Sequence, residues 1–434
     1  MDRSRDGRTS QSRYGAVGPA GGRAKQRAFL VAALPEGDDL SELRELLRTA
    51  GVATVGELVQ HRDRPHANTY VGPGKVEELR DAVRHHDANL VACDDELTPR
   101  QERNLEQALG VPVVDRTAVI LDIFADHAHT AEGKLQVELA QLEYNLARMR
   151  GLWSHLERLG GGIGTRGPGE TQIETDRRLA RDRISVLRRR LRRVGASRQV
   201  MRAERERAGL PRIALAGYTN AGKSSLLNAL TGASAAVADR LFHTLDPTTR
   251  TLPVGGRPVL VTDTVGFIRK LPHALVDAFG ATLEETRLAD LIVHVVDASV
   301  AEAELDAMIA AVDEVLEEIG AGATPRVVAF NKLDLVDDER RQELRLRDRA
   351  GLAVSATTGE GVDGLVGRIE AEFRRALSSV ELLFPYREGG RLAELHSVAD
   401  GLEREDTAEG VRVVARLPAA LAARYERFAV NGRG

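Results

Sequence analysis

Residues 26–128 alternate short apolar runs with longer stretches in which apolar positions recur every three or four residues. The apolar runs RAFLVAAL (27–34), VATVGELV (52–59) and ANLVAC (88–93) predict strands. The stretches SELRELLRTAG, VEELRDAVRHH and TPRQERNLEQALG have the periodicity of helices, and two of them end at glycine, as helices commonly do. The pattern predicts an N-terminal α/β domain over residues 26–128.

A longer helical period follows this domain. Apolar residues recur at threes and fours from Leu135 to Leu159, and again from Ile184 to Val194. Each stretch has the apolar stripe of an amphipathic helix, and two such stripes can bury each other in an antiparallel hairpin. We therefore predict a helical hairpin over residues 129–208. Its tip is the glycine-rich loop GGGIGTRGPGETQ (160–172), which is longer than a hairpin needs and is a candidate functional loop; a flexible hinge is the alternative.

From residue 212 onward, short β-branched or apolar runs alternate with helical stretches. The runs are RIALAG, VLVTDT, LIVHVVDA, RVVAFNKLD and LAVSAT. This order is typical of an α/β fold with a doubly wound, mostly parallel sheet, which we place at residues 209–380. A small C-terminal domain is expected at 381–434, with VRVVARL (411–417) as a strand. Residues 1–25 are rich in Gly, Ser and Arg without periodicity and predict a disordered basic tail.

Composition limits the possible settings for this protein. With 434 residues, 42% hydrophobic and 29% charged, the chain is expected to form several globular domains. The single cysteine, Cys93, leaves no intramolecular disulfide framework, and no apolar run reaches the roughly 20 residues that span a bilayer. We expect a cytoplasmic monomer with no membrane-spanning segment and no secretory signal. A net charge of −4 means that any nucleic-acid binding must be local.

The segment GYTNAGKS (217–224) fits the pattern G-x-x-x-x-G-K-[ST] and lies between a predicted strand and a predicted helix. The glycines let successive backbone N–H groups face phosphate oxygens, and the helix N-terminus adds a partial positive charge. Lys223 is expected on the β- and γ-phosphates and Ser224 on Mg²⁺. The phosphate-loop candidates are Gly217, Tyr218, Thr219, Asn220, Ala221, Gly222, Lys223 and Ser224.

Three further motifs follow in the order that guanine nucleotide sites require. DTVG supplies a carboxylate for the Mg²⁺ shell and a glycine N–H for the γ-phosphate, and its candidates are Asp263, Thr264, Val265 and Gly266. NKLD supplies Asp334, which can accept hydrogen bonds from guanine N1–H and the 2-amino group, donors that adenine lacks. SAT offers backbone N–H groups to guanine O6. The base-binding candidates are Asn331, Lys332, Leu333, Asp334, Ser355, Ala356 and Thr357.

With these motifs the chain resembles the HflX family of GTPases, which also share FHTLDPTTR (242–250), DTVGFIRKLP (263–272), YVGPGK (70–75) and the helical hairpin. The resemblance implies a ribosome-associated GTPase that acts on the large ribosomal subunit and splits or rescues stalled or stressed ribosomes, with Mg²⁺ as cofactor. It implies that Thr244 joins Ser224 on the metal, while Thr248 and Thr249 remain alternatives. Phe242, His243, Thr244, Leu245 and Asp246 are the nucleotide candidates of this segment.

The catalytic water-orienting group is not identified. Ras-like enzymes have a glutamine directly after the motif equivalent to DTVG, and this chain has Phe267, whose ring cannot orient water by hydrogen bonding. Since intrinsic hydrolysis is slow even with the glutamine, at about 10⁻⁴ per second, we expect a slow enzyme. A partner is expected to stimulate it by ordering the switch segments, placed at 248–272, or by supplying a group.

The second hairpin helix is strongly basic. Residues 177–207 contain thirteen arginines against Asp182, Glu204 and Glu206, a local balance of 13 − 3 = +10. A solvated charged face is the ordinary explanation of such a run, but this excess favours a polyanion such as ribosomal RNA. The RNA-binding candidates are Gly162, Gly164, Arg166, Gly169, Arg177 and Arg178. The family resemblance implies that the glycine-rich loop probes the peptidyl-transferase region of the large subunit.

Two alternatives to a ribosome-splitting GTPase remain open. One is a GTP-dependent binding factor that acts in ribosome assembly or hibernation. The other is an RNA-dependent ATPase that uses VGPGK and Lys75 of the N-terminal domain, where a strand-to-helix turn with a solvent-exposed lysine is the simpler interpretation.

Overall fold

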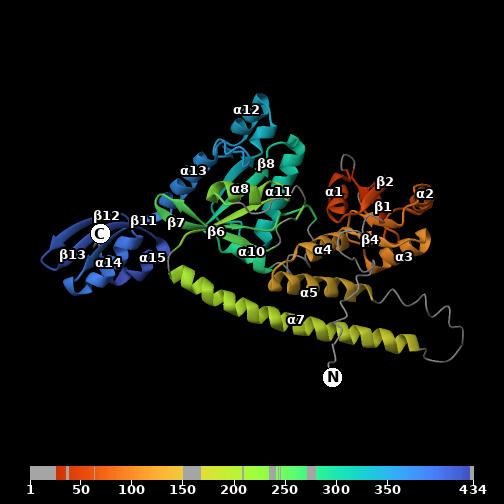
Figure 1. The fold of residues 1–434 in the computed structure, drawn as a ribbon, viewed down its shortest axis with the longest axis horizontal. Helices are drawn as coiled ribbons and strands as arrows, with labels where there is room; N and C mark the ends of the chain where they lie inside the picture. Colours follow the sequence, from red (N-terminus) through yellow and green to blue (C-terminus); the bar gives the residue numbers. More distant parts are fainter. Residues whose placement is uncertain are drawn as a thin grey trace, which may run out of the picture. The chain divides into compact units, whose positions relative to one another are not determined.

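The computed structural model of the 434-residue chain describes residues 26–430, apart from 36–38, 63, 150–167, 208–209, 234–240, 243, 245 and 271–279. The chain divides into two compact units (Figure 1). The first comprises Met1–Arg192 together with Ala238–Leu245 and Lys270–Gly280, and the second comprises the remaining segments. The predicted α/β class, with a doubly wound sheet, a helical hairpin and a small C-terminal domain, is confirmed.

The N-terminal part of the first unit is a four-stranded parallel sheet of order β2-β1-β3-β4. Its strands are β1 (Arg27–Leu34), β2 (Ala53–His61), β3 (Leu90–Cys93) and β4 (Val113–Asp115). Its helices are α1 (Ser41–Thr49), α2 (Pro73–His85), α3 (Pro99–Leu109) and α4 (Arg116–His127). Val31, Val91 and Leu105 are among the fully buried residues of its core.

Strand β4 and helix α4 are not predicted from the sequence pattern. β4 is only three residues long, and α4 is buried over most of its length, so its sequence RTAVILDIFADH lacks the polar face that marks an amphipathic helix. Asp115 caps α4 by accepting a hydrogen bond from the Ala118 N–H at 2.9 Å.

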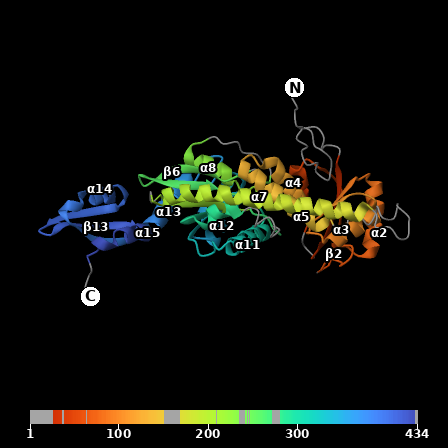
Figure 2. The same cartoon turned by 90° about the horizontal axis from the view of Figure 1, so that it is seen from below.

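The hairpin consists of α5 (Ala131–Arg148) and α7 (Pro168–Arg207), which run in opposite directions (Figures 1 and 2). Leu139 of α5 packs with Ile184 and Leu187 of α7, as their spacing predicts. The predicted tip loop at 160–172 is too long at its C-terminal end, because α7 already begins at Pro168. Proline suits the first turn of a helix, where its missing N–H has no intrahelical partner. Gly162, Gly164 and Arg166 lie outside the described residues.

The second unit contains a six-stranded sheet of order β10-β9-β8-β5-β7-β6, parallel except for β6. Its strands are β5 (Arg212–Gly217), β6 (Thr248–Val254), β7 (Arg257–Asp263), β8 (Leu291–Asp297), β9 (Arg326–Asn331) and β10 (Leu352–Ala353). Its helices are α8 (Lys223–Thr231), α10 (Gly280–Arg287), α11 (Glu302–Glu318), α12 (Asp338–Arg347) and α13 (Val362–Arg375). Helices α8 and α13 contribute to one buried cluster and α11 and α12 to another, so the sheet is covered on both faces.

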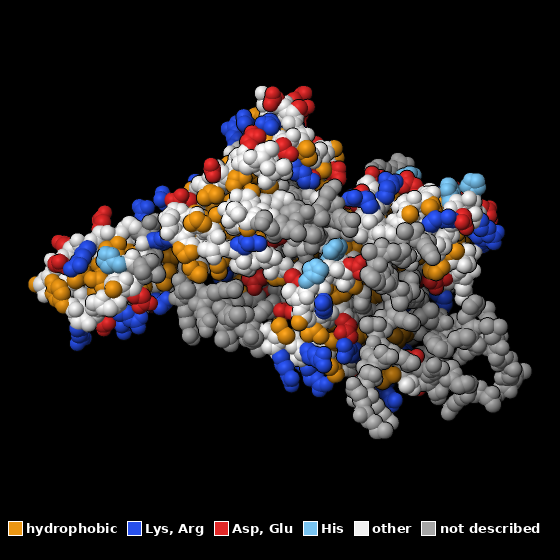
Figure 3. Space-filling model, viewed as in Figure 1, with side chains coloured by type: hydrophobic (Ala, Val, Ile, Leu, Met, Phe, Trp, Pro, Cys, Tyr) orange, Lys and Arg blue, Asp and Glu red, His pale blue; other side chains and the backbone are white. Residues whose placement is uncertain are grey.

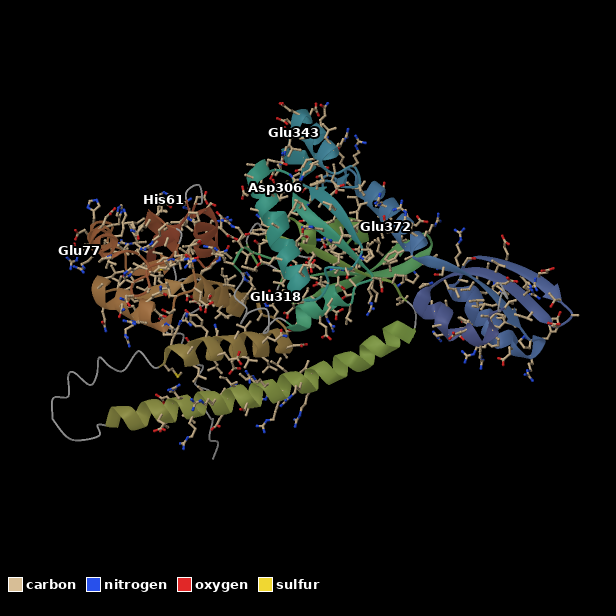
Figure 4. All side chains as sticks on the ribbon, turned by 180° about the vertical axis from the view of Figure 1, so that it is seen from behind. His61, Glu77, Asp306, Glu318, Glu343 and Glu372 are labelled. Atoms are coloured by element: carbon tan, nitrogen blue, oxygen red, sulfur yellow. The ribbon has the colours of Figure 1, made fainter. Side chains whose placement is uncertain are left out.

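Ion pairs join α11 to α12 on the outside of this sheet. Arg340 of α12 lies 2.6 Å from Glu302 of α11, and Arg347 pairs with Asp306, which is labelled in Figure 4. The two carboxylates are more than half exposed, so each pair contributes little to stability by itself.

The C-terminal domain is a three-stranded antiparallel sheet of order β11-β13-β12 with two helices. It comprises β11 (Leu377–Phe384), α14 (Gly389–Val398), β12 (Asp400–Thr407), β13 (Gly410–Pro418) and α15 (Ala419–Arg424), and it begins before the predicted boundary at 381 because β11 starts at Leu377. The predicted strand 411–417 lies within β13. Among the described helices of the chain, none is long and apolar enough to cross a bilayer.

A buried histidine in β8 makes the stability of the second unit depend on pH. Burial lowers the pKa of His294 to about 4, although Asp313 opposes this shift. In the unfolded chain the imidazole titrates near 6.5, so protons bind the unfolded state more strongly as the pH falls from about 6.5 to about 4. The unfolding free energy of the unaltered protein should therefore fall between pH 7.5 and pH 5. In His294→Leu this fall should be smaller by about 2 kcal/mol. Urea unfolding of both proteins at the two pH values measures the difference. An equal fall in unfolding free energy in both proteins would show that His294 is not the cause.

Candidate nucleotide site

The phosphate-loop candidates form a tight turn between β5 and α8. Gly222 has φ +89°, and a Cβ atom there would lie 2.2 Å from Asn331 Nδ2. A Cβ atom on Gly217 would lie 2.2 Å from the Val295 carbonyl oxygen. Asn220, between them, is also left-handed at φ +61°. The two glycines of the motif are therefore required by close approach to the neighbouring strands and not by turn flexibility alone.

Lys223 lies folded over this loop. Its ammonium donates to the carbonyl oxygens of Gly217 at 3.0 Å and Tyr218 at 2.7 Å, and the side chain is buried. Burial lowers the pKa of Lys223 to about 8, while Asp263 opposes that shift. A buried ammonium beside a loop of backbone N–H groups suits a phosphate. The negative charge of a bound phosphate would stabilise the charged form of Lys223, which burial disfavours.

The two predicted Mg²⁺-associated residues meet. Ser224 Oγ, in the first turn of α8, donates to Asp263 Oδ2 at 2.6 Å, at the end of β7. A hydroxyl and a carboxylate are oxygen ligands of the kind that Mg²⁺ takes in proteins. The residues present at this edge of the sheet therefore fit that ion.

The three threonine alternatives differ in their surroundings. Thr249 is paired in β6, with its hydroxyl 2.9 Å from that of Thr262 in β7. Thr248 opens β6 opposite Asp263, and Thr244 precedes the strand. The hydroxyl contact with Thr262 makes Thr249 the least suited of the three to a moving switch. His243 and Leu245 lie outside the described residues.

The predicted switch boundaries of 248–272 are wrong over residues 248–263. Those residues form the antiparallel pair β6 and β7, whose register runs from Thr248 opposite Asp263 to Val254 opposite Arg257. The run VLVTDT predicts a strand and lies largely in β7, whereas β6 is not predicted, because TTRTLPV is an exposed edge strand without a regular apolar alternation.

Phe267 is a packing residue. Its side chain is fully buried, its N–H donates to the Gly217 oxygen at 3.1 Å, and its own carbonyl oxygen accepts from the Thr219 N–H at 2.7 Å. The hydroxyl of Tyr218 accepts from the Arg269 N–H at 2.8 Å. The segment after DTVG is thus fastened to the phosphate loop, and its aromatic side chain points into the core.

The base-binding motifs are joined to the phosphate loop through Asn331. Its side-chain amide donates to the Ala221 oxygen at 2.9 Å and accepts from the Ala356 N–H at 3.0 Å. The exposed carboxylate of Asp334 accepts from Ser355 Oγ at 2.5 Å. NKLD, SAT and GYTNAGKS therefore lie at one edge of the sheet, as the parallel strand order requires.

Sequence reasoning missed Asp297, which pairs with Lys332 at 2.6 Å and accepts from the Ser299 hydroxyl and N–H. Asp297 ends β8, so its position at the carboxyl end of a predicted parallel strand was the available signal. The backbone of Lys332 itself is left-handed, at φ +64°.

A P-loop GTPase is defined by three features of this unit: the strand order, the phosphate loop with Lys223, and the link that Asn331 makes between the phosphate loop and the base-binding motifs. Sequence-family profiles agree: residues 212–332 match the family described as 50S ribosome-binding GTPase, residues 37–125 the GTP-binding GTPase N-terminal region, and residues 127–205 the GTP-binding GTPase middle region.

The chain belongs to the HflX family of GTPases. It is 47% identical over 407 residues to GTPase HflX of Lacrimispora saccharolytica, covering 92% of this chain and 95% of the relative. It is 45% identical over 390 residues to GTPase HflX of Escherichia coli K12, covering 88% and 90%. A solved GTP-binding protein of Sulfolobus solfataricus in complex with GDP is 25% identical, with a TM-score of 0.42, covering 80% of this chain and 98% of that chain. Because it belongs to this family of GTPases and contains the P-loop domain, the protein is a GTP hydrolase.

We expect Asp334→Asn to change the base preference of the site. In the asparagine an NH2 donor replaces one of the two carboxylate acceptors. This donor repels the 2-amino group of guanine and can donate a hydrogen bond to the 2-oxo group of xanthine. GTP affinity should fall about 100-fold or more, and xanthosine triphosphate should become the better substrate. Competition binding with a fluorescent guanine nucleotide measures both. Asp338→Asn, an exposed neighbour, is the matched control, and unchanged GTP affinity in Asp334→Asn would exclude Asp334 from base recognition.

Proposed function

We propose that this GTPase binds the large ribosomal subunit through the basic outer face of α7 and uses its GTP cycle to separate stalled or stressed ribosomes. Support comes from the family, whose matching profile is described as 50S ribosome-binding GTPase, and from the charge of α7. The observation that carries the proposal is the division of the α7 arginines between two faces.

One face of α7 is used inside the protein. Ala180, Ile184 and Leu187 are buried. Beside this stripe, Arg183 and Arg188 pair with Glu138 and Glu143 of α5, at 2.6 and 2.7 Å. These two arginines are therefore already compensated by acidic partners.

The opposite face of α7 is available to a partner. At about 100° per residue, Arg178, Arg189 and Arg193 lie on the side away from the apolar stripe, and all three are exposed. Figure 3 shows Lys and Arg side chains gathered over the middle of this helix, between the parts that grey atoms cover. A row of arginines at this spacing suits the phosphates of an RNA helix, to which each can donate two hydrogen bonds.

The nucleotide site supports a cycle that depends on the partner. Mg²⁺, held by Ser224 with Thr244 and the Asp263 carboxylate, would neutralise phosphate charge when GTP is bound. Lys223 binds the phosphates and Gly266 meets the γ-phosphate. Since Phe267 cannot orient water, hydrolysis is slow until the ribosome orders the switch segments or supplies the missing group.

The two alternative functions, an assembly or hibernation factor and an ATPase of the N-terminal domain, predict different experimental results. A factor for assembly or hibernation would bind ribosomal subunits without separating ribosomes over repeated turnovers. For an ATPase of the N-terminal domain, Lys75 would bind phosphate, but its ammonium is paired with Glu78 at 2.8 Å, as in an ordinary surface turn of α2.

We expect large subunits or whole ribosomes to raise the GTP hydrolysis rate at least about tenfold, and added salt to reduce this stimulation because phosphate contacts release counterions. The triple variant Arg178→Glu, Arg189→Glu, Arg193→Glu should lose the stimulation and retain its intrinsic rate and GTP affinity. Phosphate release measures the rate, and light scattering follows ribosome separation.

The matched control is Arg345→Glu, Arg349→Glu, Arg387→Glu, which makes the same charge change at exposed sites elsewhere. Equal loss in both triple variants would point to net charge and not to α7. Absence of stimulation in the unaltered protein would refute ribosome-dependent GTPase activity.

A further inference from the structure

The segment that follows DTVG is joined to the phosphate loop by a small backbone bridge. The Phe267 N–H donates to the Gly217 oxygen at 3.1 Å, and the Phe267 oxygen accepts from the Thr219 N–H at 2.7 Å. The two bonds pair Phe267 with Tyr218 in parallel. The phosphate loop and the segment up to Arg269 both belong to the second unit, so this bridge lies within one compact part of the protein.

The side chain of Tyr218 extends the bridge by one further bond. Its hydroxyl accepts from the Arg269 N–H at 2.8 Å, and the residue is buried. The donor is the backbone of Arg269, so this bond does not depend on the guanidinium. A phenylalanine in place of Tyr218 would keep the ring but could not accept this bond.

Tyr218 also contacts the lysine of the phosphate loop. Its carbonyl oxygen accepts from the Lys223 ammonium at 2.7 Å. Tyr218 therefore binds the ammonium expected on the terminal phosphates through its backbone, and the segment after DTVG through its hydroxyl.

Gly266 lies against the same part of the phosphate loop. A Cβ atom added to it would lie 2.8 Å from Thr219 Cα and Cγ2, and 3.0 Å from Lys223 Nζ. The φ of Gly266 is not left-handed, so close approach to the loop, and not backbone freedom, requires the glycine. The backbone N–H expected on the γ-phosphate is thus already held beside Lys223.

The bond at Arg269 supports this placement of Gly266. The bridge at Phe267 is isolated and consists of two hydrogen bonds, with no longer ladder to stabilise it. A third bond two residues further along holds the chain on the far side of the bridge, and bonds in one network strengthen each other. A donor that is held in place before the reaction needs no reorganisation when charge develops on the phosphate.

We propose that Tyr218 is a positioning residue for GTP hydrolysis: its hydroxyl holds the Arg269 N–H, and the closed bridge keeps the Gly266 N–H aligned for the γ-phosphate. GDP lacks that phosphate, so its binding does not depend on the hydroxyl. The proposal concerns the intrinsic reaction and does not require the ribosome.

The test compares Tyr218→Phe with the unaltered full-length protein in the absence of ribosomes. Tyr218→Phe removes one oxygen and should lower the single-turnover rate of GTP hydrolysis about tenfold and weaken GTPγS binding, with the GDP dissociation constant unchanged within about twofold. The matched control is Tyr386→Phe, which removes a hydroxyl that donates to the Thr407 oxygen at 2.7 Å in the C-terminal domain. It should change none of these quantities.

Hydrogen exchange with GDP bound tests the contact itself. In Tyr218→Phe the backbone amides of residues 266–269 should exchange about tenfold faster, and in Tyr386→Phe they should exchange at the rate of the unaltered protein. Three results would overturn the proposal: unchanged exchange at 266–269 in Tyr218→Phe, an unchanged hydrolysis rate despite faster exchange, or equal losses of GDP and GTPγS affinity. Ribosome stimulation is measured separately, so its absence leaves this test intact.

Discussion

The side-chain amide of Asn331 is the contact on which the nucleotide site depends. It donates to the phosphate loop at Ala221 and accepts from the base-binding segment at Ala356, so two segments 135 residues apart keep one spacing. Gly222 must lack a side chain because a Cβ atom would collide with this amide. The phosphate loop, the NKLD motif and the SAT motif are therefore one rigid unit. A GTPase needs this rigidity because its catalytic effect is mostly positioning of the phosphates and base.

Buried charge organises the N-terminal unit in a similar way. Arg148, at the end of α5, donates to Glu102 at 2.9 Å and to Asp115 at 2.8 Å, and its guanidinium stacks on Tyr144 at 3.4 Å from the ring centroid. Burying such groups is costly unless all are paired, so the network fixes geometry more than it adds stability. It joins the first hairpin helix to the carboxyl edge of the N-terminal sheet. Asp94, which holds Lys270, lies at the same edge.

Two segments of the chain pass from the nucleotide unit to the N-terminal unit and back. The chain around 238–245 and 270–280 belongs to the N-terminal unit, while the segments on either side belong to the nucleotide unit. In the first segment the ring of Phe242 packs 4.6 Å from that of Phe124, and in the second the Lys270 ammonium pairs with Asp94 and Asp95. Phe242 and Lys270 both have positive φ values. The N-terminal unit therefore includes two short segments that are flanked in sequence by the nucleotide unit, and each has a described side chain that packs or pairs within the N-terminal unit.

The sequence by itself determined the elements whose signals are local. Strand β1 occupies the predicted residues 27–34, the apolar stripes of α5 and α7 pack together, and the glycine and lysine positions of GYTNAGKS form the phosphate loop, because periodicity and backbone freedom are properties of short segments. The tertiary structure decided β4, the wholly buried α4, the edge strand β6 and the partners of Lys332 and Lys270. Those features depend on burial from both sides or on charges that meet from distant strands, and no short window of sequence contains either.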